Sequence, residues 1–338
     1  MRDTAVLLHH LKPLQALLDG DGVTEVVVNT PGWIGVEDAK GWRWVETECL
    51  TADWLRRLAT AAAAFTQQDV TDSRPICSTE LPRGERCQIV IPPAVPADEI
   101  SITIRKPSSL DLSLEDLERG GLFGDVRGAT AETADLTPED LVLVDLHRRN
   151  EWAAFLRGAV RARKNILVSG ATGAGKTTIS KALIPLIPAD ERIVTIEDTR
   201  ELVVPHKNRV HMLYAKDGAG RAQIGPKDLL ESALRMRPDR ILLQELRDGT
   251  AFYYLRNVNS GHPGSITTLH ANSAMLAFEQ LTLLVKESEA GRDLTRDDIR
   301  SLLYQLVDVV MQVHKVEGGN RRVTEIYFDP HRKLESGH

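Results

Sequence analysis

The sequence predicts an α/β protein with two domains, an N-terminal α/β domain with an antiparallel sheet and a C-terminal domain with a largely parallel sheet. The chain has 338 residues, enough for about two domains of ~150 residues. Short apolar segments alternate with turn sequences before Lys106, whereas strands alternate with helices after Leu141. Residues 118–140 are rich in Gly, Ala, Thr, Asp and Glu, which is typical of a flexible linker.

These observations divide the chain into three parts. We expect an N-terminal domain at 1–117, a flexible linker at 118–140 and a C-terminal domain at 141–332. The alternative is a long surface loop at 118–140 that decorates a single domain.

The N-terminal domain is expected to begin with a helix and to continue as a meander of short strands. Five leucines fall on a helical repeat, at Leu7, Leu8, Leu11, Leu14 and Leu18. Thr51 is a candidate N-cap for an alanine-rich helix that ends near residue 66. Strands are expected at 24–29, 34–37, 42–45, 87–92 and 100–105.

Two apolar features of this domain allow more than one interpretation. The leucine face is expected to pack on the sheet, with a membrane-binding amphipathic surface as the alternative. Four tryptophans are expected to pack in the core or on hairpins rather than to stack on a ligand, namely Trp33, Trp42, Trp44 and Trp54.

The C-terminal domain shows the alternation that produces a parallel sheet covered by helices. Helices are expected at 175–186 and 226–237, the second with a proline in its first turn. A terminal hairpin is predicted from two strand-like segments, 308–315 and 321–328, which flank Gly318-Gly319-Asn320. Other strands are expected at 165–169, 192–196, 240–244 and 265–269.

Composition excludes several classes of protein. The 42 Lys and Arg against 48 Asp and Glu give a net charge of −6, which disfavours a nucleic-acid-coating protein. The three cysteines form no CxxC pair and indicate neither a disulfide framework nor a zinc site, so a reducing cytoplasm fits best. The longest nearly apolar stretch, 58–65, is far shorter than the ~20 residues that cross a bilayer. Residues 1–19 are not expected to form a secretory signal, because they lack a cationic start followed by a sustained apolar core.

The strongest motif is a full match to GxxxxGK[ST] directly after the strand at 165–169. Its glycines let backbone N–H groups surround phosphate oxygens at the N-terminus of a helix. We expect Lys176 to contact the β and γ phosphates and Thr177 to bind Mg²⁺. The expected nucleotide-binding residues are Gly170, Ala171, Thr172, Gly173, Ala174, Gly175, Lys176, Thr177 and Thr178.

Nucleotide hydrolysis also needs a group that orients or deprotonates water. Glu245 follows the apolar strand at 240–244 and is the expected catalytic residue, with a simple ion pair to Arg247 as the alternative. Glu197 follows another strand and is also expected to act in catalysis, through contacts to water or to the surroundings of Mg²⁺. The alternative is a loop cap in which Asp198 accepts from backbone amides.

His270 lies at the junction between the strand at 265–269 and the helix after it, and it is expected to sense the γ-phosphate or to link neighbouring groups. Five other histidines are expected to have only packing or hydrogen-bonding roles, namely His9, His10, His147, His206 and His211.

These segments together resemble the secretion ATPase superfamily. Residues 170–177, 196–201, 235–245 and 261–271 look like its Walker A, Asp box, Walker B and His box, in the family's order. Residues 84–92 and 101–107 are similar to the N-terminal half of the VirB-type traffic ATPases of type IV secretion. Gln244 departs from the pattern, because the family usually carries Gly before the Walker B glutamate.

The resemblance implies a C-terminal RecA-like P-loop ATPase domain and an ATP-hydrolysing motor for substrate translocation, pilus biogenesis or both. It also implies a homohexamer that binds ATP and Mg²⁺ between domains, with Arg105 as the arginine that reaches the phosphates. The expected location is cytoplasmic, peripheral at the inner membrane through the secretion channel and coupling components, with no specific nucleic acid.

Two other functions remain as alternatives to this motor. A RecA-like nucleic-acid motor would share the phosphate loop, but the chain has no concentrated Lys/Arg stripe. A nucleotide-gated scaffold would bind without turnover, which Glu245 disfavours.

Overall fold

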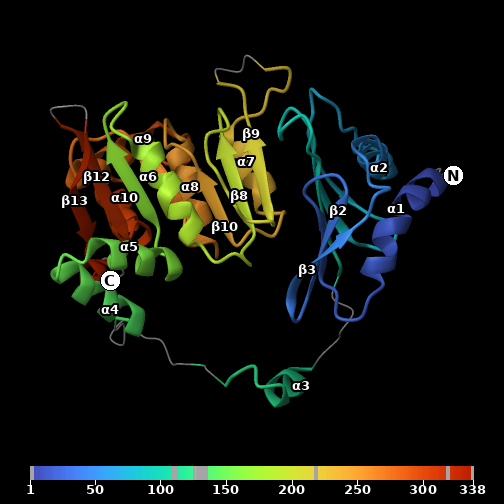
Figure 1. Cartoon of the computed structure of the whole chain (residues 1–338), viewed down its shortest axis with the longest axis horizontal. Helices are drawn as coiled ribbons and strands as arrows, with labels where there is room; N and C mark the ends of the chain where they lie inside the picture. The colour runs from blue at the N-terminus through green and yellow to red at the C-terminus, as the bar shows by residue number, and fades with distance from the viewer. Residues whose placement is uncertain are drawn as a thin grey trace.

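The computed structural model describes residues 4–107, 113–124, 126, 136–216, 220–316 and 320–335. Its N-terminal domain, drawn in blue to teal in Figure 1, contains a six-stranded antiparallel sheet. The strand order is β3-β2-β1-β6-β5-β4. The strands are β1 (Glu25–Val28), β2 (Trp33–Asp38), β3 (Gly41–Glu46), β4 (Ile76–Glu80), β5 (Arg86–Val90) and β6 (Ser101–Arg105). The helices are α1 (Thr4–Leu18) and α2 (Ala52–Phe65), and the side chain of Thr51 caps α2 as expected.

The leucine face of α1 packs on this sheet. Leu7, Leu11, Leu14 and Leu18 are buried in one cluster with apolar side chains of the strands, whereas Leu8 is 48% exposed. The packing interpretation is therefore confirmed for four of the five leucines. None of the helices in the described ranges is both long and apolar enough to span a membrane.

The C-terminal domain contains two strand groups, β9-β8-β10 and β11-β7-β12-β13. A parallel bridge between Glu245 and Thr268 joins their neighbouring edges. All pairs are parallel except the terminal hairpin β12–β13. The strands are β7 (Ile166–Gly170), β8 (Ile193–Glu197), β9 (Arg209–Leu213), β10 (Arg240–Leu243), β11 (Ile266–Leu269), β12 (Val309–Lys315) and β13 (Arg321–Phe328). The predicted α/β fold class, with an antiparallel N-terminal sheet, is confirmed.

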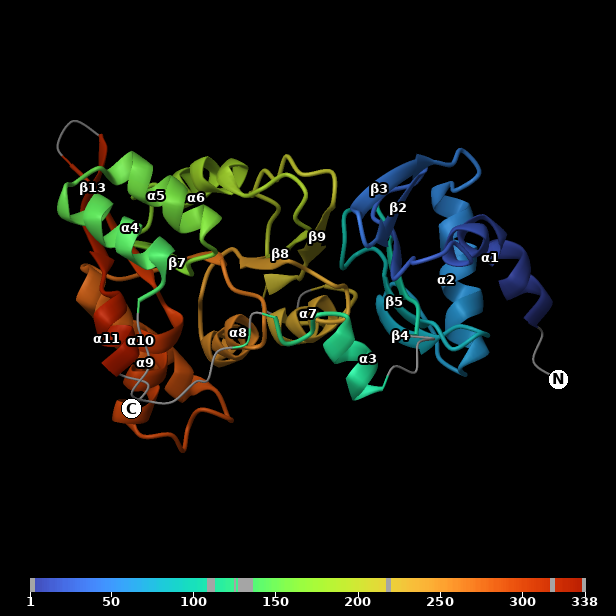
Figure 2. The same ribbon diagram turned by 90° about the horizontal axis from the view of Figure 1, so that it is seen from below.

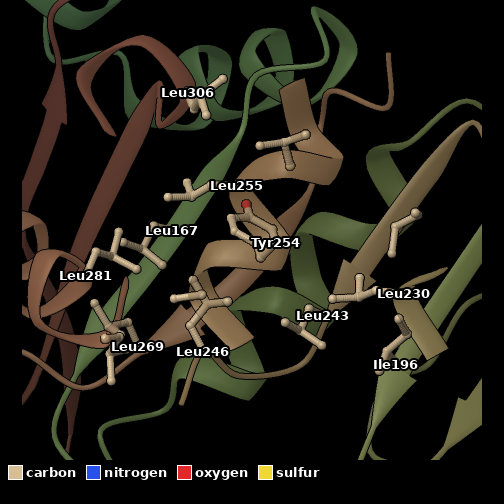
Figure 3. Close-up of a cluster of buried hydrophobic side chains, with 14 of the residues drawn as sticks. Leu167, Ile196, Leu230, Leu243, Leu246, Tyr254, Leu255, Leu269, Leu281 and Leu306 are labelled. Carbon is tan, nitrogen blue, oxygen red and sulfur yellow. The ribbon is translucent and has the colours of Figure 1, made fainter. Parts of the chain in front are cut away.

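Helices cover both faces of the C-terminal sheet (Figure 2). One face carries α4 (Pro138–Arg148), α5 (Trp152–Arg161) and α6 (Lys176–Leu183), with a 3-10 turn at Ile184–Leu186. The other face carries α7 (Pro226–Ala233), α8 (Thr250–Asn259), α9 (Ala274–Glu287) and α10 (Arg296–Leu306). Figure 3 shows the core on this second face, where Leu167, Leu243 and Leu269 from the strands meet Tyr254 and Leu281 from the helices. The short helix α11 (Pro330–Glu335) ends the described chain.

The segment predicted as a linker joins the two sheets. The short helix α3 (Leu114–Arg119) overlaps its start, and α4 begins within it at Pro138. Residues 125 and 127–135 of the predicted linker lie outside the described residues. The boundaries at 117, 118–140 and 332 therefore stay predictions.

The two domains of the chain share a buried interface beside β9 and α7 (Figures 1 and 2). Arg192, just before β8, is fully buried and donates hydrogen bonds to Asn29 Oδ1 at 2.9 Å and Thr103 Oγ1 at 3.1 Å in the N-terminal domain. It also donates to the carbonyl of Met236 at 2.8 Å. Val90, Ala94 and Val95 of the N-terminal domain belong to the C-terminal core cluster. The domains of one chain are thus joined by a packed core.

Cationic side chains of the C-terminal domain lie over tryptophan rings of the β2–β3 hairpin. The Lys207 Nζ lies 3.8 Å from the ring centre of Trp33 and 5.2 Å from that of Trp44. Arg192 lies over Trp42 at 5.9 Å, whereas Trp54 packs on α1 and donates to the carbonyl of His10 at 3.2 Å. These contacts fit the expected packing role, with cation–π contacts across the interface as the unforeseen part.

Glu25, on β1, makes the stability of the folded chain depend on pH. Its side chain is 3% exposed, Arg105 Nε lies 3.7 Å from Oε1, and Oε2 has no hydrogen-bond partner. Burial, followed by the nearby Glu37 carboxylate, raises the pKa of Glu25 from 4.5 to about 7. Between pH 4.5 and about 7, Glu25 therefore keeps its proton in the folded chain but releases it in the unfolded chain. The free energy of unfolding accordingly falls as the pH rises through this range.

Glu25→Gln is therefore expected to raise the free energy of unfolding at pH 8 by on the order of 1–3 kcal/mol, and to change it little at pH 4.5. Urea denaturation at both pH values measures this difference. Glu46→Gln, at an exposed carboxylate on β3, is the matched control and should have no effect. Equal stability of wild type and Glu25→Gln at pH 8 would contradict the raised pKa.

Candidate active site

The glycine-rich loop leaves the carboxyl end of β7 and opens α6, as the motif predicts. A Cβ on Gly170 would lie 2.5 Å from the carbonyl oxygen of Val313 on β12, so a side chain cannot fit there. Gly173 and Gly175 have φ angles of +76° and +103°, which side-chain-bearing residues rarely adopt. The local sequence thus fixes a compact loop whose backbone can approach an anion closely.

Lys176 lies inside this loop. Its side chain donates from Nζ to the carbonyls of Gly170 at 2.9 Å and Ala171 at 3.2 Å, and Nζ lies 3.3 Å from His270 Nδ1. Burial lowers the pKa of Lys176, and the nearby Glu245 carboxylate opposes this shift. The cation is therefore held where the loop would surround phosphates.

Glu245 lies two residues after β10 and faces His270, which directly follows the neighbouring strand β11. His270 Nε2 is 2.6 Å from Glu245 Oε1, and Arg247 binds the other carboxylate oxygen. Arg247 in turn reaches Asp198 Oδ2 at 3.0 Å. The structure therefore brings together Lys176, His270 and Glu245, and it also contains the expected alternative, an ion pair between Glu245 and Arg247.

Glu197 has a different environment from the one expected of a group that contacts water or magnesium. Its side chain is fully buried and accepts from Thr195 Oγ1 at 2.8 Å and from the amides of Glu201 at 2.7 Å and Leu202 at 2.8 Å. Burial acts to raise its pKa, but these hydrogen bonds and one with His211 lower it overall. The capping role expected for Asp198 belongs to Glu197, so its position does not support the predicted catalytic role.

Arg105 is not brought to the phosphate loop by its own chain. Its side chain is 69% exposed, and its ion pair is with Glu25. The physical reason is the site of domain contact: the N-terminal domain packs at the edge strand β9, where the amide of Leu213 donates to the carbonyl of Ala94 at 2.8 Å. The strands β8, β10 and β11 lie between β9 and β7, whose carboxyl end carries the loop.

The remaining histidines have neighbours that suit structural roles. His10 stacks edge-on against Trp54 with ring centres 4.6 Å apart, and His9 lies near the same ring. The other three bond to main-chain or side-chain oxygens near them, namely His147 to Ile326, His206 to Ile187 and His211 to Thr195.

The donors at this site suit a magnesium ion that is bound mainly by phosphates. Across the described ranges, no group of three or more His, Cys, Asp or Glu side chains could hold a metal ion. Thr177 is half-buried in the first turn of α6, next to Lys176. Because Mg²⁺ usually takes one or two protein ligands beside substrate phosphates, a single hydroxyl fits that chemistry.

A cavity of about 570 Å³ lies beside Glu245, lined among others by Tyr214, Lys216, Gln223 and Arg247. Lys216 and Gln223 were not predicted to belong to the site, and Arg247 was expected only as an ion-pair partner of Glu245. The position of Arg247 two residues after the strand-end glutamate was the one available signal. The loop that carries Lys216 and Gln223 showed no motif.

The fold and these residues define a two-domain P-loop ATPase. Comparison with known proteins is more specific: the model of the type II/IV secretion system protein family matches residues 8–317. The chain belongs to this family.

Its relatives act in type IV secretion. The chain is 53% identical to the type IV secretion system protein VirB11 of Bartonella henselae, over 97% of this chain and 94% of the relative. It is 44% identical to the type IV secretion system protein PtlH of Bordetella pertussis, over 94% of each. The crystal structure of the VirB11 ATPase from the Brucella suis type IV secretion system, in complex with sulphate, matches with a TM-score of 0.93 and 44% identity, covering 99% of this chain and 97% of that chain. The predicted family and ATPase activity are thus confirmed.

Proposed function

We propose that this ATPase couples ATP hydrolysis to substrate translocation, pilus biogenesis or both in a bacterial type IV secretion system. The observation that carries the proposal is the contact series from Lys176 through His270 to Glu245, at 3.3 Å and 2.6 Å. It joins the phosphate-binding cation to the candidate base through a histidine at the end of β11. A change at the γ-phosphate can therefore affect the residue that acts on water.

Each residue has a proposed step. Lys176 neutralises the β and γ phosphates, and the loop amides hold their oxygens. Thr177 would hold Mg²⁺, which when bound neutralises phosphate charge. Glu245 orients the attacking water and accepts its proton once phosphate oxygens compete for His270 and Arg247. The outcome is ADP and phosphate, with the changed contacts of His270 as the local signal of turnover.

The Arg105 contact requires a second copy of the chain. Because Arg105 is held away from the loop of its own chain, an N-terminal domain of a neighbouring subunit would have to supply the guanidinium. A closed ring provides such a neighbour to every subunit. This supports the proposed homohexamer with nucleotide at subunit borders.

Arg105→Ala is expected to lower ATP turnover by on the order of 10–1000-fold while ring formation stays within about twofold, because an arginine at the transferring phosphoryl group acts mainly in the transition state. Phosphate release and sizing with a non-hydrolysable ATP analogue measure the two effects. Arg83→Ala is the matched control, since Arg83 pairs with Asp19 on the same domain. Only monomer in the presence of Mg²⁺ and the analogue would contradict the ring.

The partners are proposed to be the secretion channel and coupling components, which would recruit the motor to the cytoplasmic face of the inner membrane. The burial of four α1 leucines supports recruitment by proteins over insertion of that helix face. The experiment is co-purification from a native envelope, in which channel proteins should accompany wild type. Salt-sensitive retention of DNA by the ring in place of channel proteins would favour the nucleic-acid motor.

A further inference from the structure

A β-bulge in the terminal hairpin changes which side chains at the start of β13 point to each face of the sheet. Gln312 on β12 is opposite Glu325, but the next residue, Val313, is opposite Val323, so Thr324 is an extra residue. Ile326 and Phe328 pack with the cluster under α5 and α6, which includes Val313. Strict alternation would continue that face through Thr324 and residue 322. The bulge shifts it to Val323 and residue 321 instead.

Arg321 is thereby directed toward the phosphate loop. A Cβ on Gly175 would lie 2.5 Å from Arg321 Cδ and 3.1 Å from Nε. Its Nη1 lies 3.5 Å from Thr178 Oγ1 in the first turn of α6. The contact joins residues 143 positions apart, so it depends on the bulge and not on local sequence.

The charge of Arg321 has no acidic partner at this location. Arg321 is exposed and takes part in no ion pair among the described residues. The first turn of α6 contains no acidic residue, and Lys176 is already there. A second cation beside the positive end of a helix dipole is unfavourable until an anion binds. The arrangement therefore favours a bound anion that both cations can contact.

We propose that Arg321 is a nucleotide-binding residue that contacts the phosphate group next to the nucleoside. Lys176 extends toward His270 and Glu245, the side expected for the γ-phosphate, whereas Arg321 lies against Gly175 and Thr178. Arg321 thus contacts a part of the nucleotide that ATP and ADP share. Such a contact strengthens ground state and transition state equally, so it lowers KM and leaves kcat unchanged.

The test measures the Kd of ADP and of a non-hydrolysable ATP analogue for the full chain, together with steady-state phosphate release. Arg321→Ala should weaken both nucleotides about tenfold, which corresponds to about 1.4 kcal/mol, and raise KM to the same extent with kcat within twofold. Arg321→Lys should fall between wild type and Arg321→Ala, because a lysine keeps the charge but loses the two-pronged guanidinium. Arg322→Ala, one residue away on the opposite face of β13, should match wild type.

Each other outcome has a defined meaning. Unchanged affinity of Arg321→Ala for both nucleotides overturns the proposal, and so does a loss of kcat with unchanged ADP binding. A purely structural role would lower the melting temperature without nucleotide and leave the nucleotide-induced increase intact. The inference rests on the proposed phosphate loop, which Lys176→Ala checks in the same assay: if that variant binds normally, the loop assignment itself fails.

Discussion

Glu245→Gln is expected to bind ATP with wild-type affinity and to hydrolyse it at least ~100-fold more slowly. The loop residues that hold phosphates are unchanged, so binding persists. The amide cannot accept the proton of the attacking water, and general-base catalysis typically contributes 10²–10⁴-fold. The amide can keep a hydrogen bond with His270, which lies 2.6 Å from Oε1, so the geometry is retained. Nucleotide binding and single-turnover hydrolysis separate the two effects.

Glu201→Gln is the matched control for this variant. Glu201 is exposed in the loop after β8, and its backbone amide donates a hydrogen bond to Glu197. We expect its turnover to stay near that of wild type. Hydrolysis at the parental rate by Glu245→Gln would instead place the base at another residue.

Lys176→Ala is expected to lose both nucleotide binding and measurable turnover, with a decrease in turnover on the order of 1000-fold. The variant removes the cation that the loop holds through the carbonyls of Gly170 and Ala171. Because burial already lowers the pKa of this ammonium group, its removal should cost the ligand-free fold little. Thermal unfolding should therefore show a melting temperature near that of wild type without ATP and no increase when ATP is added.

Lys181→Ala gives the control on the same helix, since Lys181 is exposed in the last turn of α6. It should keep wild-type binding and turnover. Persistent hydrolysis by purified Lys176→Ala, with Lys181→Ala normal, would remove the assignment of this loop as the phosphate site.

Local patterns predicted most of the strands and the loop correctly. The segment before Gly170 is apolar and β-branched, and glycines at 173 and 175 need positive φ angles, so composition and conformation agree at short range. The strands without a prediction are β4 and β9, and each mixes polar with apolar side chains. Such segments are stabilised by their neighbours in the sheet more than by their own pattern.

The contacts between distant segments could not be predicted from the pattern. Glu197 was expected at the reaction centre because it ends a strand, yet backbone amides four and five residues later bind it. Arg105 was matched to the phosphates by motif, but its domain packs at the edge strand β9, separated by three strands from β7 and the loop. Arg321 reaches the loop only because one extra residue shifts the register of β13. Each outcome depends on tertiary packing, which spacing along the chain does not contain.

The close approach of Gly170 to Val313 has a consequence for the entropy of nucleotide binding. The start of the loop is fixed against β12 by main-chain atoms of both strands, which are paired in parallel register. The conformational freedom of this part of the loop is therefore lost when the chain folds, not when ATP arrives. Binding then needs little further ordering of the backbone there, and more of the phosphate interaction energy becomes affinity. The carboxyl end of β7 is thus already ordered before the nucleotide binds. The conformational entropy lost in ordering it is part of the free energy of folding of the C-terminal domain.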